Sequence, residues 1–137
     1  MNEQPAMPPR GGFWQLLGVV TEERHDGYGR VRLPVTPDLL RGGEGQPLHG
    51  GVYMTVADMA CVLAARSALR EGERLGGTAE MSISFLRPVF SGAVIGEARV
   101  LKKGRMLVVC DADVSDDQGR LVAKARASFA VLAPDPT

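Results

Sequence analysis

The sequence lacks an excess of charge of either sign. Its 137 residues include 16 basic and 16 acidic side chains, so the formal net charge at pH 7 is +0. Binding to a nucleic acid or to an anionic membrane surface through charge requires a basic excess. We therefore expect neither a nucleic acid nor a membrane as a partner. The length suffices for one domain with a real hydrophobic core.

Cysteines are few, and the chain shows no signal-peptide core. Cys61 and Cys110 both lie in apolar stretches without the spacing of metal ligands, so we expect buried free thiols in a reducing compartment and no metal site. Residues 1–10 are expected to form a loose tail. The apolar run at residues 51–65 is shorter than the ~20 residues that cross a bilayer, and it contains Asp58. These features predict a cytoplasmic protein.

That apolar run is the most informative stretch of the chain. From Val52 to Ala65 nearly every side chain is apolar or small, and Asp58 is the one carboxylate. A helix that is apolar on all sides is a buried helix, and no Gly or Pro interrupts this one. We expect it to begin at Gly50 or Gly51. Because a lone buried carboxylate is costly unless it is paired, Asp58 needs either a function, a helix partner or an interface ion pair.

Strand patterns lie on both sides of this helix. Before it, a short helical pattern at residues 13–17 precedes two strand-like runs joined by the turn Asp26–Gly27, and then a helical turn at 36–40. After it, Gly76 and Gly77 are expected to close a loop. Four runs that alternate apolar and polar residues follow, at 78–88, 93–101, 106–114 and 121–131. This order predicts an α+β domain over residues 11–133, with an antiparallel sheet wrapped around the helix.

Several motifs within this order resemble one family. His49-Gly50-Gly51 stands at the mouth of the helix, Asp58 follows nine residues after the His, and residues 81–88 read Met-Ser-Ile-Ser-Phe-Leu-Arg-Pro. The segments Leu-Lys-Lys-Gly-Arg at 101–105 and Leu-Val-Ala-Lys-Ala at 121–125 match as well. Together they resemble the hotdog fold and, more narrowly, the PaaI-like acyl-CoA thioesterases. The resemblance covers residues 13–132 and implies one long central helix inside the sheet.

The resemblance implies hydrolysis of an acyl-CoA thioester to free acid and CoA, with no metal and no cofactor besides the CoA of the substrate. The backbone N–H of Gly50, at the positive end of the helix, would polarise the thioester carbonyl. Asp58 would act as general base or as nucleophile. In relatives the carboxylate comes from the neighbouring subunit, which implies a homo-oligomer, either a dimer or a dimer of dimers.

Further residues take their roles from the same resemblance. Thr78 aligns with a hydroxyl that holds the water, although its strand parity is that of the polar residue Glu80. His49 is expected to hold the loop by hydrogen bonds rather than to transfer a proton. Gly43 stands where relatives usually carry Asn or Gln, and Gln46 is the nearby replacement. The other residues expected to contact the substrate or the CoA phosphates are Gly51, Phe85, Arg87, Lys102, Lys103, Gly104 and Arg105.

Two other functions stay open at this point. A non-catalytic acyl-CoA-binding protein is compatible with Gly43 in place of the amide side chain. A hotdog hydratase or dehydratase would normally pair a catalytic His with a carboxylate in a different local pattern, which the sequence does not contain. The strand at residues 78–88 is expected to pair with its copy across a two-fold axis, because the edge of this small sheet would otherwise stay open.

Overall fold

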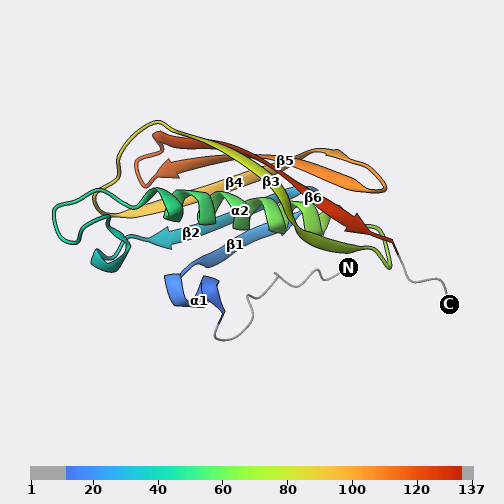
Figure 1. Ribbon diagram of the computed structural model, residues 1–137, viewed down its shortest axis with the longest axis horizontal. Helices are drawn as coiled ribbons and strands as arrows, with labels where there is room; N and C mark the ends of the chain where they lie inside the picture. Colours follow the sequence, from blue (N-terminus) through green and yellow to red (C-terminus); the bar gives the residue numbers. More distant parts are fainter. Residues whose placement is uncertain (1–11, 134–137) are drawn as a thin grey trace.

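The computed structural model describes residues 12–133, in which one antiparallel sheet curves around one long helix (Figure 1). The predicted tail at residues 1–10 lies outside the described residues. The elements in chain order are α1 (Phe13–Leu17), β1 (Val20–His25), β2 (Tyr28–Pro34), η1 (Pro37–Leu39), α2 (Gly50–Ser67), β3 (Arg74–Phe85), β4 (Ala93–Lys103), β5 (Leu107–Asp116) and β6 (Leu121–Leu132). The six strands lie in the order β1-β2-β4-β5-β6-β3, which confirms the predicted α+β architecture.

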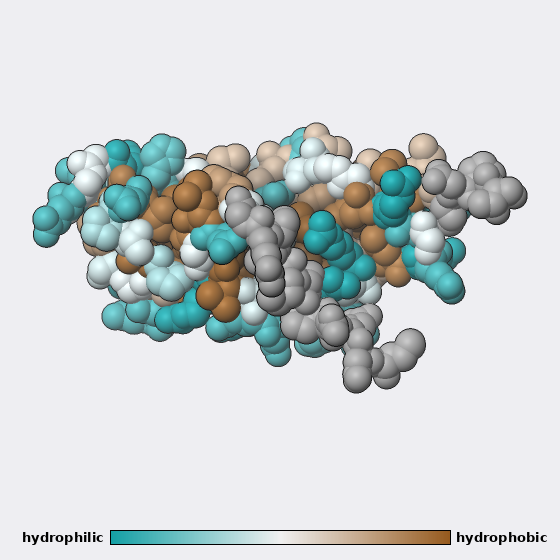
Figure 2. Space-filling model, turned by 90° about the horizontal axis from the view of Figure 1, so that it is seen from below, coloured by the Kyte–Doolittle hydropathy of each residue, from teal (hydrophilic) through white to brown (hydrophobic). Residues whose placement is uncertain are grey.

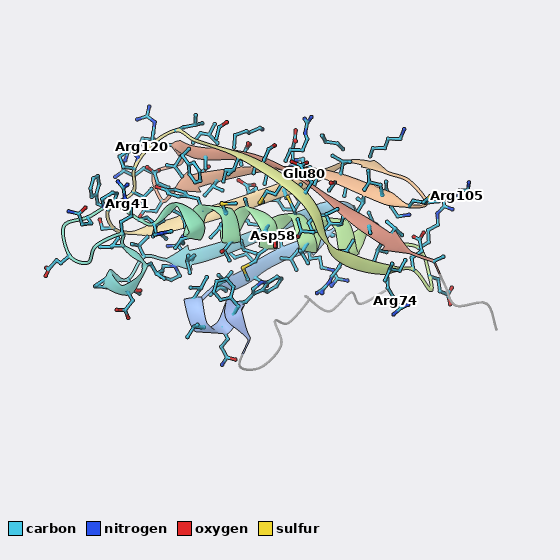
Figure 3. All side chains as sticks on the ribbon, in the orientation of Figure 1. Arg41, Asp58, Arg74, Glu80, Arg105 and Arg120 are labelled. Carbon is cyan, nitrogen blue, oxygen red and sulfur yellow. The ribbon has the colours of Figure 1, made fainter. Side chains whose placement is uncertain are left out.

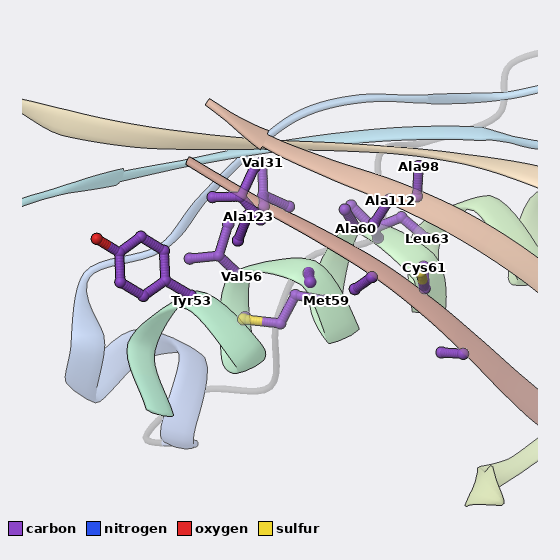
Figure 4. Close-up of a cluster of buried hydrophobic side chains, with 14 of the residues drawn as sticks. Val31, Tyr53, Val56, Met59, Ala60, Cys61, Leu63, Ala98, Ala112 and Ala123 are labelled. Atoms are coloured by element: carbon purple, nitrogen blue, oxygen red, sulfur yellow. The ribbon is translucent and has the colours of Figure 1, made fainter. Parts of the chain in front are cut away.

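Helix α2 is the core of the domain. It contains 18 residues, of which ten are buried, and it packs against the concave face of the sheet (Figure 4). Two glycines allow the helix to approach the sheet closely. A Cβ on Gly29 of β2 would lie 2.5 Å from the backbone oxygen of Ala60, and one on Gly96 of β4 would lie 2.7 Å from Val56 Cγ1. Small residues on the inner face of the sheet therefore set the depth at which α2 sits.

The two cysteines face the same interior. Cys61 lies on α2 and Cys110 on β5, and both are buried free thiols, as expected. The Cys110 thiol donates a weak hydrogen bond to the Cys61 carbonyl oxygen, with 3.7 Å between sulfur and oxygen. The hydrogen-bonded Cys110 thiol and, after it, burial raise the pKa of the Cys61 thiol far above its ordinary value. Both thiols are therefore part of the packing.

Strand β3 differs from its prediction at the N-terminal end. It begins at Arg74, and Gly76 and Gly77 lie inside it, so the predicted loop at these glycines is wrong. The pairing of β3 with β6 shifts twice, between Leu75 and Thr78 and again between Thr78 and Glu80. Such shifts are β-bulges, and glycines in a strand often accompany them. The glycines here accommodate an irregular strand instead of ending one.

Strand β3 is also an edge of the sheet, because it pairs with β6 on one side only among the described strands. Most of its residues are exposed on both faces. Large apolar side chains stay exposed at its C-terminal end, where Phe85 and Leu86 are each 53% exposed.

Figure 2 shows apolar surface in the middle of one face of the molecule, interrupted by polar side chains. Within residues 12–133, no helix is both long enough and apolar enough to cross a membrane.

Candidate active site

Asp58 and Thr78 form a hydrogen-bonded pair. Asp58 lies midway along α2 (Figure 3), and its Oδ1 accepts a hydrogen bond from Thr78 Oγ1 at 2.7 Å. The Asp58 side chain is half-buried. Burial raises the pKa of the Asp58 carboxyl above its ordinary value, while the hydrogen bond from Thr78 opposes that rise. The structure thus brings together the carboxylate and the hydroxyl that the family resemblance associates.

The bulges in β3 explain how Thr78 reaches the helix. In a regular strand Thr78 would share the outer face with Glu80 and Ser82, as the alternation of the sequence indicates. The register shift between Thr78 and Glu80 inserts an extra residue, so Thr78 points to the same face as Met81. That face covers α2. The hydroxyl therefore meets Asp58 because of an irregularity that strand periodicity does not reveal.

Asp58 and Thr78 line a pocket of about 460 Å³. This volume is in the range of small-molecule sites. Its walls are mostly apolar and come from α1, α2, β3 and β6, with the guanidinium of one arginine among them. The residues that line it besides the pair are Phe13, Trp14, Val62, Arg66, Leu75, Gly76, Gly77 and Phe129. We refer to it as the Asp58 pocket.

Sequence reasoning missed the aromatic walls of the Asp58 pocket. The pattern at residues 13–17 predicts an amphipathic helix, but it does not say where that helix packs. In the structure Phe13 and Trp14 of α1 lie beside Val62 of α2. Phe129 is fully buried on the inner face of β6, where the alternation predicts a core residue. Only the tertiary packing assigns these side chains to a site.

The N-terminus of α2 forms a second pocket, of about 380 Å³. Gly50 is the first residue of the helix, so its N–H has no acceptor within the helix. A Cβ on Gly50 would lie 3.3 Å from the ring of Phe85, which leaves little space beyond the glycine. Tyr53 donates a hydrogen bond to the Arg87 carbonyl oxygen at 3.1 Å and holds this end of the pocket together. Phe85 and Arg87, both expected to contact the substrate, thus lie beside Gly50.

His49 is the N-cap of α2. Its Nδ1 accepts a hydrogen bond from the N–H of Gly51 at 2.9 Å, and its own backbone N–H donates to the Leu39 carbonyl oxygen at 3.0 Å. Since the Nδ1 lone pair is occupied by the backbone of the helix, that nitrogen is not available to a substrate in this geometry. The arrangement fixes the loop before the helix and orients the amides of its first turn.

The loop before His49 does not place Gln46 at the helix mouth. Gln46 and Gly43 belong to one turn, in which the Gln46 N–H donates to the Gly43 carbonyl oxygen at 3.1 Å. The Gln46 side chain is exposed, and it packs near Gly42. Neither Gln46 nor Gly43 lines the pocket at Gly50 or the Asp58 pocket. Within one chain, the structure therefore places Gln46 outside both pockets.

The basic hairpin between β4 and β5 is only partly available to a ligand. Lys103 Nζ lies 2.9 Å from a Glu73 carboxylate oxygen and also donates to the Gly104 carbonyl oxygen at 2.9 Å. The side chains of this ion pair are 15% and 10% exposed. Lys102 and Arg105 are exposed, and Figure 3 shows Arg105 at the hairpin end of the molecule. Of the three predicted phosphate contacts, Lys103 is held inside the protein.

Gly50 and Asp58 belong to different pockets of one chain. Eight residues separate them on α2, which corresponds to about 12 Å along the helix axis. A single carbonyl group cannot contact both. A site that uses both residues must therefore combine two copies of the chain.

Among residues 12–133, no three His, Cys, Asp or Glu side chains are grouped in a way that could hold a metal ion.

Comparisons with known proteins place the chain in a family. Residues 45–123, more than half of the chain, match the family model of the thioesterase superfamily. A candidate esterase of Halobacterium salinarum is 36% identical over 132 residues, which cover 90% of this chain and 87% of that protein. The proofreading thioesterase EntH of Klebsiella pneumoniae is 36% identical over 85 residues, or 62% of this chain and 61% of that protein. The structure of the PaaI protein of E. coli, at 28% identity, superposes with a TM-score of 0.79 over 90% of this chain and 86% of that one.

Proposed function

The chain belongs to the thioesterase superfamily and is a thioester hydrolase of the PaaI-like type with the hotdog fold, and we propose that its substrate is an acyl-CoA. The observation that carries this proposal is the pair of Asp58 and Thr78, joined at 2.7 Å on the wall of an apolar pocket. An acyl chain fits such a pocket because the chain and most of the pocket walls are apolar. In this placement the thioester carbon lies beside the Asp58 carboxylate. The EntH relative is itself named as a thioesterase.

In the proposed reaction Asp58 acts as the general base. Its carboxylate takes a proton from water while the water oxygen attacks the thioester carbonyl carbon, and the Thr78 hydroxyl orients the carboxylate. The negative charge that develops on the carbonyl oxygen is stabilised by the N–H of Gly50. Collapse of the tetrahedral intermediate breaks the carbon–sulfur bond, and the leaving CoA thiolate takes the proton from Asp58. Direct attack by Asp58 would instead form an acyl-aspartyl anhydride.

We propose that Asp58 and Gly50 of one active site come from two copies of the chain. Strand β3 is an edge of 12 mostly exposed residues, and a long exposed edge favours pairing with a second β3. If two β3 strands pair antiparallel about a point between Met81 and Ser82, Thr78 of one copy lies opposite Phe85 of the other. Thr78 donates a hydrogen bond to Asp58, and the Phe85 ring lies next to Gly50. One such pairing would form two complete sites.

We propose that Lys102 and Arg105 contact the phosphates of CoA, because both are exposed and cationic. The reaction requires no metal or redox cofactor, so treatment with a chelator is expected to leave the rate unchanged. An acyl-CoA substrate and two unpaired, buried cysteines fit a cytoplasmic location.

Release of free thiol from a panel of acyl-CoA substrates tests the proposed activity. A hydrolase produces one thiol for each ester consumed, whereas a protein that only binds acyl-CoA produces none and still retains it in a binding assay. That second result would replace the proposed function with the non-catalytic alternative.

Mixed assemblies test the shared site. An Asp58→Asn chain and a Gly50→Val chain are each expected to be inactive alone, since Gly50→Val fills the space beside the Phe85 ring. Mixed together, they should recover part of the activity, because one interface then carries an intact Asp58 and an intact Gly50. The absence of recovery in assemblies shown to contain both chains would contradict a site between subunits.

A further inference from the structure

A groove rich in arginine lies at the C-terminal end of α2. Its volume is about 520 Å³. The charged residues that line it come from β1, α2 and the turn into β3: Arg24, Arg66, Arg70, Arg74, Glu71 and Glu73. We refer to it as the arginine groove. It shares Arg66 and Leu75 with the Asp58 pocket, so the two are neighbours along α2.

Three arginines of this groove, Arg24, Arg66 and Arg70, have few side-chain acceptors among the described residues. Arg24 Nε is buried and has no hydrogen-bond partner among the described residues. The ion pairs found within residues 12–133 do not include Arg66 or Arg70. A buried donor without an acceptor is unfavourable, and so are guanidinium groups gathered in one groove. An anion that accepts hydrogen bonds from the exposed guanidinium groups of Arg66 and Arg70 would offset their mutual repulsion.

The carboxylates in the groove do not supply that anion. Glu73 is bound by Lys103 Nζ at 2.9 Å and accepts a hydrogen bond from the Arg70 N–H at 2.7 Å, and these interactions lower the pKa of its carboxyl. It is therefore held by a lysine that is not among the groove residues. Glu71 is exposed, so the groove is lined by four arginines against two carboxylates, one of which also binds Lys103. The groove keeps a net positive charge.

The helix dipole explains only part of this cluster. Cations near the C-terminus of a helix are favourable, which accounts for Arg66 and Arg70 at the end of α2. It does not account for Arg24, which lies on β1, lines the same groove and has a buried Nε without a partner among the described residues. Three separate parts of the chain thus contribute guanidinium groups to one surface. Guanidinium groups bind carboxylates and phosphates with paired hydrogen bonds.

We propose that the arginine groove binds an anionic oxygen group of the thioester substrate, either a carboxylate or a phosphate. This inference rests on the proposed function, because it takes the thioester to be at Asp58. Arg66 lies eight residues beyond Asp58, or about 12 Å along α2. A carboxylate at the far end of the acyl group would reach the groove through the Asp58 pocket. A phosphate of CoA would reach it from outside.

Three substrates distinguish the two sources. Hexanoyl-CoA carries the phosphates only, adipoyl-CoA adds a carboxylate at the far end of an acyl chain of equal length, and hexanoyl-pantetheine carries no phosphate and no carboxylate. The variants are Arg24→Gln and Arg66→Gln. The matched control is Arg32→Gln, which removes an equal charge from β2 at a position that does not line the groove.

If a carboxylate is the ligand, both groove variants should raise KM for adipoyl-CoA by about tenfold or more relative to the control, and KM for hexanoyl-CoA should follow the control. If a phosphate is the ligand, KM should rise for both CoA esters and not for hexanoyl-pantetheine. If neither groove variant changes any KM beyond the control, the proposal is wrong.

A second measurement does not depend on the variants folding or on catalysis. Calorimetric titration of the unaltered protein with adipate and with ADP should show binding of one of them, and high salt should weaken that binding. If the unaltered protein hydrolyses no acyl-CoA, the proposed function fails, and this titration still decides whether the groove takes an anion. Binding of neither anion overturns the inference even in an active hydrolase.

Discussion

Replacement of Asp58 by Asn is the sharpest test of the proposed chemistry. Asn has nearly the shape of Asp, and its side-chain oxygen can still accept the hydrogen bond that Thr78 Oγ1 donates at 2.7 Å. The change removes the basicity and the negative charge alone. Loss of a positioned general base lowers kcat by about 10²–10⁴-fold, or about 2.7–5.4 kcal/mol of activation free energy. We expect that loss with little change in the affinity for CoA.

The same change should raise the free energy of unfolding. Burial raises the pKa of Asp58 in the folded protein above the value of about 3.9 that it has in the unfolded chain. Below the unfolded pKa both states are protonated and the carboxyl has no effect on stability. As the pH rises from the unfolded pKa to the folded pKa, the unfolded state loses its proton first, so the folded state is increasingly penalised, and the full penalty remains at higher pH. Asp58→Asn is not subject to this penalty, so it should be more stable at pH 7 and should lose that advantage below the unfolded pKa.

Two assays on one sample check this prediction. Thiol release gives kcat, and urea unfolding at pH 7 and at a pH below 4 gives the stability difference. Glu80→Gln is the matched control, since it removes an exposed carboxylate from the adjacent strand. The kcat/KM of the unaltered enzyme should fall as the pH is lowered through the raised pKa of Asp58. An Asp58→Asn enzyme that hydrolyses acyl-CoA at the parent rate would refute the mechanism.

Other substitutions separate positioning, binding and packing. Thr78→Val removes a hydroxyl hydrogen bond to a carboxylate, which is worth about 1.5–3 kcal/mol, so kcat should fall by roughly ten- to a hundredfold with KM nearly constant. A fall in KM with kcat unchanged would contradict the positioning role of Thr78. Lys102→Ala combined with Arg105→Ala should raise KM for acyl-CoA and reduce its salt dependence, whereas a collapse of kcat would rule out a role confined to binding phosphates. Gly29→Ala should destabilise the fold by about 1–3 kcal/mol in urea unfolding, because the added Cβ would lie 2.5 Å from the Ala60 carbonyl oxygen. If the variant has wild-type stability, α2 can move away from the sheet.

The sequence predicts the architecture well because its signals there are local and repeated. The apolar run of α2, the alternation of Ala123, Ala125 and Ala127 in β6, and the Asp26–Gly27 turn each favour one conformation, and the structure contains all three. Asp26 has φ at 47° and Gly27 at 75°, the backbone that such a turn requires. Patterns of this kind agree with each other, so their order is sufficient to predict a sheet wrapped around a helix.

The candidate site is less predictable because it depends on contacts between distant segments. The pairing register of β3 with β6 decides which face Thr78 occupies, and strand periodicity in β3 alone favours the wrong face. Likewise, residues 13–17 read as a helix, yet only their packing places Trp14 beside Asp58. The resemblance to a family supplied the association of Thr78 with Asp58, whereas the physical reading of the strand argued against it.

Three errors of the sequence reading concern one place in the fold. The loop expected at Gly76 and Gly77, the strand parity of Thr78 and the missed role of Trp14 all concern the walls of one pocket. Sequences that fold reliably are locally consistent, so departures from local rules are expected where function requires them. Here two bulges interrupt the ladder between β3 and β6, and a carboxylate stands in an otherwise apolar helix. The bulges and the carboxylate each disfavour the fold. They meet at the hydrogen bond of 2.7 Å that Thr78 Oγ1 donates to Asp58 Oδ1. The other strand pairs contain register shifts as well, between β1 and β2, β4 and β5, and β5 and β6, so the bulges in β3 alone do not mark a site. The hydrogen bond that one of them allows, from Thr78 to the carboxylate in the helix, is what distinguishes this place in the fold.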